Sequence, residues 1–252
     1  MTREALRLRL DQLLVDRGLC ASRERARRAV MAGLVEVEGR RVDKPGTTVS
    51  AAAALVLRGP AEPFVSRAGR KLAAALDHFA IDPAGLACLD VGASTGGFTD
   101  CLLQRGAARV TALDVGHGLL DVRLRQDPRV TVVERVNARH LAADSFATPF
   151  DLIVADVSFI SVVVVAPALL PHLAAPGGRL LALIKPQFEA GRAAVGKGGI
   201  VRDEATRRRV IAERAAALAG LGLELVGTFD SPVAGAGGNV EAFALLRRGR
   251  AA

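Results

Sequence analysis

The segment Leu89-Asp90-Val91-Gly92-Ala93-Ser94-Thr95-Gly96-Gly97-Phe98-Thr99 decides the fold of most of this chain. An apolar run ends at a group of small residues, and a second apolar stretch begins at Phe98. This pattern predicts a strand, a tight turn and the start of a helix. Glycines in such a turn let the backbone bend sharply and approach a nucleoside ligand closely. The segment therefore indicates a ligand-binding turn between a strand and a helix.

Apolar runs alternate with helical patterns along the rest of the chain after this turn. Runs that are apolar throughout are typical of strands buried on both faces. Seven such strands are expected, over residues 86–91, 109–114, 130–136, 150–155, 179–184, 223–228 and 241–246. Helices are expected over 66–79, 98–105, 119–125, 162–173 and 205–219. The alternation predicts an α/β fold, doubly wound and Rossmann-like, with a mainly parallel seven-stranded sheet.

The charges near the turn distinguish between possible cofactors. The glycine spacing is not Gly-x-Gly-x-x-Gly, and Asp90 stands two residues before Gly92. A carboxylate there repels a dinucleotide pyrophosphate but suits a cationic amino group or sulfonium, which favours S-adenosylmethionine. Asp114 ends the next strand, 22 residues after Gly92, where an acid can hold ribose hydroxyls. The candidate cofactor-binding residues are Asp90, Gly92, Ala93, Ser94, Thr95, Gly96, Gly97, Phe98, Asp114, Asn137 (on the side where an adenine would lie) and Asp156.

Two charged residues directly follow two of the predicted strands. Asp156 comes after the run 150–155, and Lys185 comes after 179–184. Because ligands bind at the carboxyl ends of the strands in such sheets, we expect both side chains at the binding edge. A half-buried ammonium needs a partner or changes its protonation, so Asp156 is the expected partner of Lys185. A purely structural ion pair at the strand ends is the alternative interpretation.

The positive charge of the chain is concentrated in its first third. The 252 residues have a net charge of +8, and residues 1–72 hold 15 Lys and Arg against 8 Asp and Glu. A basic segment beside an almost neutral body predicts a polyanion-binding element, with a solvated Arg-rich surface as the alternative. Pro60 and Pro63 discourage regular structure. We therefore expect a small α+β domain over residues 1–59, a linker over 60–65 and a larger domain over 66–252.

The small domain resembles the S-four RNA-binding module. The resemblance rests on Arg9-Leu10-Asp11-Gln12-Leu13-Leu14, Ala21-Ser22-Arg23, Ala26-Arg27-Arg28 and Val35-Glu36-Val37-Glu38-Gly39. It implies a helix pair whose basic face contacts the phosphates of structured RNA. The candidate RNA-binding residues are Arg9, Arg23, Arg27, Arg28 and Lys44, together with Arg67 on the helix that opens the larger domain.

The larger domain resembles the FtsJ-type ribose 2′-O-methyltransferases, and the whole chain resembles the TlyA family of ribosomal RNA methyltransferases, also described as haemolysins. The resemblance rests on the turn quoted above and on Asp156-Val157-Ser158-Phe159-Ile160-Ser161 and Lys185-Pro186-Gln187-Phe188-Glu189. It implies a catalytic tetrad of Lys71, Asp156, Lys185 and Glu241, S-adenosylmethionine as methyl donor, and methylation of cytidine ribose in ribosomal RNA or ribosomal subunits. Lys185 would act either as a base or as an electrostatic stabiliser of the reacting oxygen.

Three other functions are alternatives to this one. One is an amino-methyltransferase acting on a nucleic-acid base, an enzyme class with Asp-Pro-Pro-Tyr/Phe loops. Asp156 and Phe159 match the first and fourth positions of such a loop, but this sequence has neither proline, and that chemistry does not call for Lys185. A membrane-lytic haemolysin needs a membrane span or a strongly amphipathic helix, and the sequence pattern indicates neither. An inert RNA-binding factor would not need the tetrad. The three cysteines form no Cys-x-x-Cys pair, so the sequence predicts a cytoplasmic enzyme without a disulfide scaffold or a metal site. Because the chain has no Trp and no Tyr, Phe159 and Phe188 are the rings available to stack on a base.

Overall fold

The chain divides into two compact units, residues 1–62 and 63–252. The computed structural model describes residues 6–20, 22–31, 33–58, 63–191, 194–196 and 198–249. The predicted linker 60–65 spans the division between the units, although its residues 60–62 lie outside the described part. Val65 is buried, and its N–H donates to Asp100 Oδ2 at 2.7 Å. The last part of the predicted linker therefore packs on the second unit.

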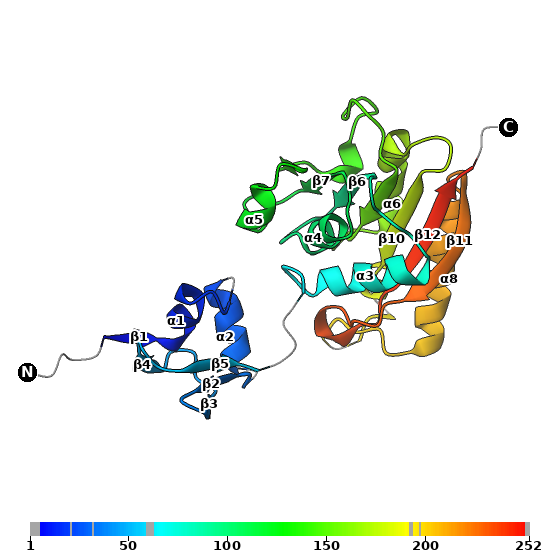
Figure 1. Cartoon of the computed structure of the whole chain (residues 1–252). Helices are drawn as coiled ribbons and strands as arrows, with labels where there is room; N and C mark the ends of the chain where they lie inside the picture. Colours follow the sequence, from blue (N-terminus) through cyan, green and yellow to red (C-terminus); the bar gives the residue numbers. More distant parts are fainter. Residues whose placement is uncertain are drawn as a thin grey trace, which may run out of the picture. The chain divides into compact units, whose positions relative to one another are not determined.

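The described part of the first unit contains two helices and two small antiparallel sheets, which can be followed in Figure 1. Its elements are β1 (Arg7–Arg9), α1 (Leu10–Asp16), α2 (Arg23–Met31), β2 (Val35–Val37), β3 (Arg40–Val42), β4 (Thr48–Ser50) and β5 (Leu55–Leu57). Leu10, Leu14 and Val30 are fully buried and join the helices to the sheets. Ser22 Oγ accepts from Arg25 N at 3.3 Å, as the N-cap of α2. The sequence pattern missed β1 and β4, which pair only with each other.

The second unit contains the predicted seven-stranded sheet, in the order β11-β12-β10-β9-β6-β7-β8. Its strands are β6 (Ala87–Val91), β7 (Arg109–Asp114), β8 (Val130–Glu134), β9 (Leu152–Ala155), β10 (Arg179–Ile184), β11 (Leu223–Asp230) and β12 (Ala242–Arg248). The pairs from β10 to β8 are parallel, whereas β12 is antiparallel to both β10 and β11. The mainly parallel, doubly wound fold is confirmed.

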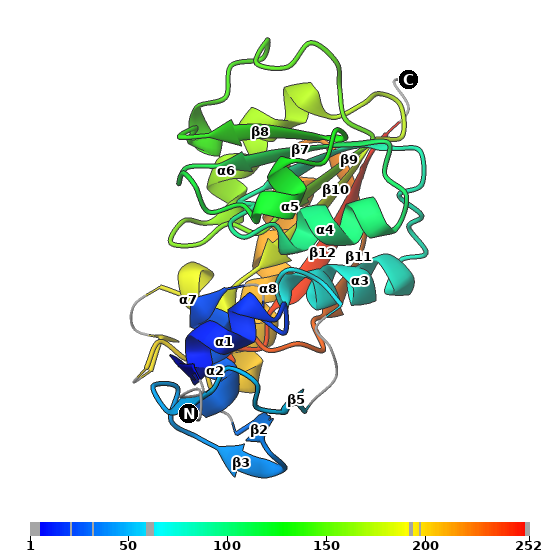
Figure 2. The same cartoon turned by 60° about the vertical axis from the view of Figure 1, so that its left-hand side comes forward.

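Helices cover both faces of this sheet (Figure 2). They are α3 (Ala68–His78), α4 (Gly97–Gln104), α5 (Val122–Arg125), α6 (Val162–Leu169), α7 (Pro186–Glu189) and α8 (Glu204–Ala219). Side chains of α3, α4 and α5 pack into one apolar core with Cys88, Val154 and Leu183. Those of α6 and α8 form the core of the other face. In the described part of the chain, no helix is both long and apolar enough to span a membrane.

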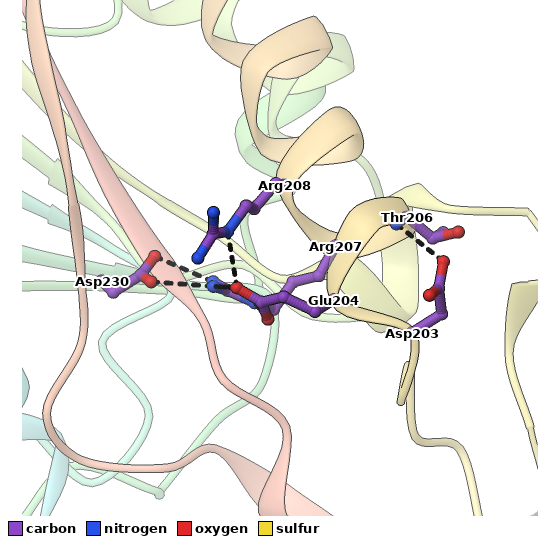
Figure 3. A network of polar contacts seen from close by, with 6 residues as sticks. All are labelled: Asp203, Glu204, Thr206, Arg207, Arg208 and Asp230. Atoms are coloured by element: carbon purple, nitrogen blue, oxygen red, sulfur yellow. Dashed lines mark hydrogen bonds and ion pairs between the residues drawn. The ribbon is translucent and has the colours of Figure 1, made fainter.

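A polar network fixes the amino end of α8 to β11 (Figure 3). The buried Arg207 guanidinium donates to both carboxylate oxygens of Asp230 at 2.9 Å and to Glu204 at 2.7 and 2.8 Å. Hydrogen bonds from Arg207 and then Arg208 lower the pKa of Glu204 to about 2. Asp203 Oδ2 accepts from Thr206 N at 2.9 Å and caps the helix. These contacts hold α8 firmly beside the sheet edge.

Candidate active site

The glycine-rich turn between β6 and α4 is shaped by close backbone contacts. Gly92 has a φ of +82°, and a Cβ on it would lie 2.5 Å from the carbonyl oxygen of Asp156. No larger residue fits there, so the turn can approach the end of β9 only because position 92 is a glycine. Ser94 also has a positive φ, and its N–H donates to Asp114 Oδ2 at 2.8 Å. These contacts hold the backbone of the turn against the ends of β7 and β9.

Asp90 lies in β6, two residues before Gly92, and one of its carboxylate oxygens has no hydrogen-bond partner among the described residues. The residue is fully buried, and its Oδ2 accepts from Thr99 N at 2.9 Å and from Thr99 Oγ1 at 2.7 Å. Its Oδ1 is buried and has no partner among the described residues. Burial is the largest cause that raises the pKa of Asp90, to about 7. An unpaired buried acceptor of this kind calls for a donor from a ligand.

Two further polar candidates for cofactor binding, Asp114 and Asn137, have local hydrogen-bond partners. Besides Ser94, the Asp114 carboxylate accepts from Gly116 N at 2.7 Å. Asn137 is exposed, and its Oδ1 accepts from Arg139 N at 3.1 Å. Neither residue is among those that line the cleft described below. The structure thus gives both residues a part in forming loops, and a contact with a cofactor remains a prediction for them.

Asp156 and Lys185 meet, as their positions after β9 and β10 predict. The two strands are parallel neighbours, with Ala155 opposite Ala182. Lys185 Nζ forms an ion pair with Asp156 Oδ1 and donates to Ser158 Oγ at 2.8 Å. Both side chains of the ion pair are largely buried. The Lys185 ammonium is therefore held by two side chains, Asp156 and Ser158, of the segment that follows β9.

Lys71 and Glu241 form a second ion pair. Lys71 Nζ, from α3, donates to Glu241 Oε2 at 2.6 Å, and Gln187 Nε2 donates to Glu241 Oε1 at 3.0 Å. Glu241 precedes β12, whose first residue, Ala242, is opposite Ile184 of β10. Because β12 is antiparallel, its amino end reaches the edge where the parallel strands have their carboxyl ends. The strand expected to begin at Glu241 begins one residue later, which leaves Glu241 in the loop beside Lys185.

The glycine-rich turn and the first ion pair share one cleft of about 170 Å³. Its lining residues are Ser66, Ala68, Asp90, Gly92, Ala93, Ser94, Thr95, Phe98, Asp156, Ser158 and Lys185. Lys71 and Glu241 are not among them, and both are almost completely buried. The four predicted catalytic residues thus form two pairs, one at the cleft (the front pair, Lys185–Asp156) and one inside the fold (the rear pair, Lys71–Glu241). A larger cleft of about 580 Å³ at the other end of α3 contains none of the predicted site residues.

The sequence pattern did not single out Ser158 or Gln187 as site residues. The only feature of the sequence that could have indicated them is their position, since Ser158 follows Asp156 by two residues and Gln187 follows Lys185 by two residues. Phe159, in contrast, was expected to be available to stack on a base. It is 89% exposed, has a φ of +65°, and its ring centroid is 5.0 Å from that of Phe188. A bulky residue in this left-handed conformation is unusual and is typical of functional sites.

The predicted RNA-binding residues fall into two groups. Arg9 and Arg23 both contact Asp11, whose side chain is fully buried, at 2.8 and 3.4 Å, and Arg28 pairs with Glu24. Hydrogen bonding from Arg9 is the main cause that lowers the pKa of Asp11. Among the described residues, no side-chain hydrogen bond or ion pair occupies the exposed groups of Arg27, Lys44 and Arg67. Arg9 and Arg23 therefore stabilise the small unit, whether or not they also contact RNA.

Comparison with known proteins assigns both units. The model of the FtsJ-like methyltransferases matches residues 64–248, and that of the S4 domain matches residues 8–54. The chain is 48% identical to "16S/23S rRNA (cytidine-2'-O)-methyltransferase TlyA" of Mycobacterium tuberculosis over 96% of this chain and 91% of that protein. It is 40% identical to "Hemolysin A" of Brachyspira hyodysenteriae over 93% of this chain and 97% of that protein.

A solved structure extends the likeness to three dimensions. A protein from Streptococcus thermophilus that carries a haemolysin name is 41% identical, with a TM-score of 0.77 over 96% of this chain and 89% of that one. The family models together cover both units, and the relatives cover nearly the whole chain. The chain is a methyltransferase that belongs to the FtsJ-like family, with an S4 domain at its amino end.

Proposed function

We propose that the chain transfers a methyl group from S-adenosylmethionine to the ribose 2′-hydroxyl of a cytidine in ribosomal RNA. One observation carries the proposal: the Lys185 ammonium, fixed by Asp156 and Ser158, lines the same cleft as the glycine-rich turn. A cofactor held by the turn and a hydroxyl placed beside Lys185 would then be neighbours. The relative named for cytidine 2′-O-methylation of ribosomal RNA, at 48% identity, supports the choice of substrate.

The residues of the turn suit S-adenosylmethionine. The unpaired Oδ1 of Asp90 offers an acceptor to its amino group, and the close-packed Gly92 lets the backbone approach it. Asp114 and Asn137 are proposed to contact its ribose and adenine. When bound, this cofactor supplies a methyl group on a positively charged sulfur, which is a strong electrophile.

Lys185 would lower the barrier at the nucleophile. A ribose hydroxyl is a poor nucleophile until its proton begins to leave, and an adjacent ammonium stabilises the negative charge that then develops on the oxygen. Lys185 Nζ is ion-paired with Asp156 Oδ1 and donates to Ser158 Oγ, which is the arrangement expected around a positively charged ammonium. We therefore assign Lys185 the electrostatic role, with the proton passing to solvent. Lys71 and Glu241 support this arrangement from inside the fold.

The S4 unit would bind ribosomal RNA through phosphate contacts. Arg27 and Lys44 have exposed charged groups suited to such contacts, and Arg67 would add one beside the cleft. Phe159 and Phe188 would stack on the base of the target nucleotide once it leaves its helix. Ribosomal RNA as the substrate places the enzyme in the cytoplasm.

The decisive experiment is the transfer of tritiated methyl from S-adenosylmethionine to ribosomal RNA or ribosomal subunits, followed by mapping of the modified nucleotide. Wild type should label a cytidine ribose, and Lys185→Ala should lose turnover while it still binds the cofactor. The exposed Arg209→Ala on α8 is the matched control and should keep full activity. Label on a base, or turnover retained by Lys185→Ala, would reject the proposed chemistry.

The haemolysin names of two relatives suggest membrane lysis as a second candidate. Dye release from vesicles tests it directly. Release that persists in highly purified protein, and in Lys185→Ala, would establish an activity separate from methyl transfer.

A further inference from the structure

Gln187 connects the two ion pairs of the site. It lies in α7, two residues after Lys185, and its Nε2 donates to Glu241 Oε1 at 3.0 Å. Lys71 Nζ donates to the other oxygen of the same carboxylate at 2.6 Å. A carboxylate only accepts hydrogen bonds, so the nitrogen of the Gln187 amide must face it. Each oxygen of Glu241 therefore has its own donor, one from α3 and one from α7.

The segment that carries Gln187 is anchored at alternate residues. Lys185 binds Asp156 and Ser158, Gln187 binds Glu241, and Glu189 Oε1 accepts from Val162 N at the start of α6 at 2.9 Å. Lys185 is a member of the front pair, and Gln187 binds Glu241, a member of the rear pair. A shift of Glu241 is consequently transmitted to the backbone two residues from Lys185.

The Glu241 carboxylate has little room to find another position. A Cβ on Gly235 would lie 2.1 Å from Glu241 Oε1, so the carboxylate packs directly against backbone. The N–H of Ser231 also donates to the carbonyl oxygen of Glu241 at 2.8 Å. Both the main chain and the side chain of Glu241 are thus fixed, and the hydrogen bond from Gln187 is part of what fixes them.

The remaining atom of the Gln187 amide shows what the amide is for. Its Oε1 is buried without a hydrogen-bond partner among the described residues. A buried unpaired carbonyl oxygen is unfavourable, and an apolar side chain of the same shape would avoid it. The amide is therefore kept in spite of its unpaired oxygen, as expected if its nitrogen is needed to satisfy and orient the Glu241 carboxylate.

We propose that Gln187 is a positioning residue for methyl transfer, which keeps the rear pair Lys71–Glu241 in register with Lys185 at the cleft. The inference rests on the function proposed above. Gln187 need not touch the substrate in this role. It acts through Glu241 and through the backbone of α7.

Two substitutions test this role. Gln187→Met keeps the length of the side chain but has no donor, so kcat should fall at least tenfold while KM for S-adenosylmethionine stays within twofold. Glu241 Oε1 loses a donor in this variant, but the unpaired oxygen of Gln187 is removed as well, so the melting temperature should fall by less than about 5 °C. Gln187→Glu should be active at low pH, where the protonated carboxyl donates to Glu241, and should lose activity as pH rises and two carboxylates face each other.

Gln126→Met and Gln126→Glu, at an exposed position after α5, are the matched controls and should behave as wild type. An active wild type whose Gln187 variants keep kcat within twofold, with an unchanged pH profile, would overturn the positioning role alone. A wild type that transfers no methyl group to RNA would overturn the proposed function and this inference together.

Discussion

Lys71 and Glu241, 170 residues apart in the sequence, form an ion pair of 2.6 Å with side-chain exposures of 6% and 2%. Removing one member leaves the other charge buried and uncompensated. We expect Glu241→Ala to lower the free energy of unfolding by about 3–5 kcal/mol, measured by urea denaturation. The double variant Lys71→Met/Glu241→Met removes both charges and should recover part of this loss. Equal stability of the single and double variants would contradict a buried, mutually dependent pair.

The raised pKa of Asp90, about 7, makes stability depend on pH. Between about pH 4 and pH 7 the folded protein keeps a proton on Asp90 that the unfolded chain has released. The free energy of unfolding should therefore fall as pH rises through this window, on the order of 1.4 kcal/mol per pH unit, and level off above pH 7. Asp90→Asn removes this dependence. The measurement is urea denaturation of both proteins at several pH values, and parallel curves would reject the assignment.

The same group gives a test of cofactor contact. If Asp90 Oδ1 receives the cationic amino group of S-adenosylmethionine, binding favours the ionised carboxylate. Affinity should then increase as pH rises from 6 to 8 in wild type, and much less in Asp90→Asn. Calorimetric titration measures both affinities. An identical pH dependence in the two proteins would separate Asp90 from the cofactor.

Phe159 combines exposure with backbone strain, and two variants separate these properties. The ring is 89% exposed, so Phe159→Ala should change the free energy of unfolding little. Phe159→Gly should increase it by about 1 kcal/mol, because glycine accepts the φ of +65° without strain. Both variants should lower kcat/KM for RNA about tenfold, since stacking on a base contributes about 1–3 kcal/mol. Val122→Ala, another exposed apolar position, is the control, and RNA kinetics unchanged in both Phe159 variants would exclude stacking.

Arg23 and Arg27 are four residues apart in α2 and so lie on the same face of the helix, but they differ in their ion-pair partners. Arg23 contacts the buried Asp11 at 3.4 Å, whereas the described residues offer Arg27 no ion pair. Arg27→Ala should weaken RNA binding and reduce the salt dependence by about one unit of slope, with unfolding changed by less than about 0.5 kcal/mol. Arg9→Ala should lower stability, because Asp11 loses its nearer partner. RNA binding at several salt concentrations, together with urea denaturation, measures both effects.

The sheet could be predicted from sequence because its strands are buried on both faces. Runs such as Leu152–Ala155 and Arg179–Ile184 are almost wholly apolar, and a charged residue stands at the end of each. The pairing of Lys185 with Asp156 followed from that alone. The pairing of Lys71 with Glu241 came from a resemblance, since nothing in either local sequence marks a buried charge.

What sequence did not show depends on neighbours that are distant along the chain. Strands β1 and β4 have three residues each, and their pairing is set by the packing of the small unit. Ser158 and Gln187 are neutral polar residues that acquire a role only through the charges beside them. The left-handed backbone of Phe159 has no signal in residue type, because glycine is the residue that usually indicates this conformation.

The place of β12 in the sheet also sets a condition on when the enzyme becomes active. β10 and β11 are synthesised first, but β12 lies between them, so they do not pair with each other. During translation, Lys71, Asp156 and Lys185 are synthesised before Glu241 and β12. The rear ion pair and the pairing of β12 with β10 and β11 then form in the same late step of folding. We therefore expect methyl transfer only once residues 241–248 have joined the sheet.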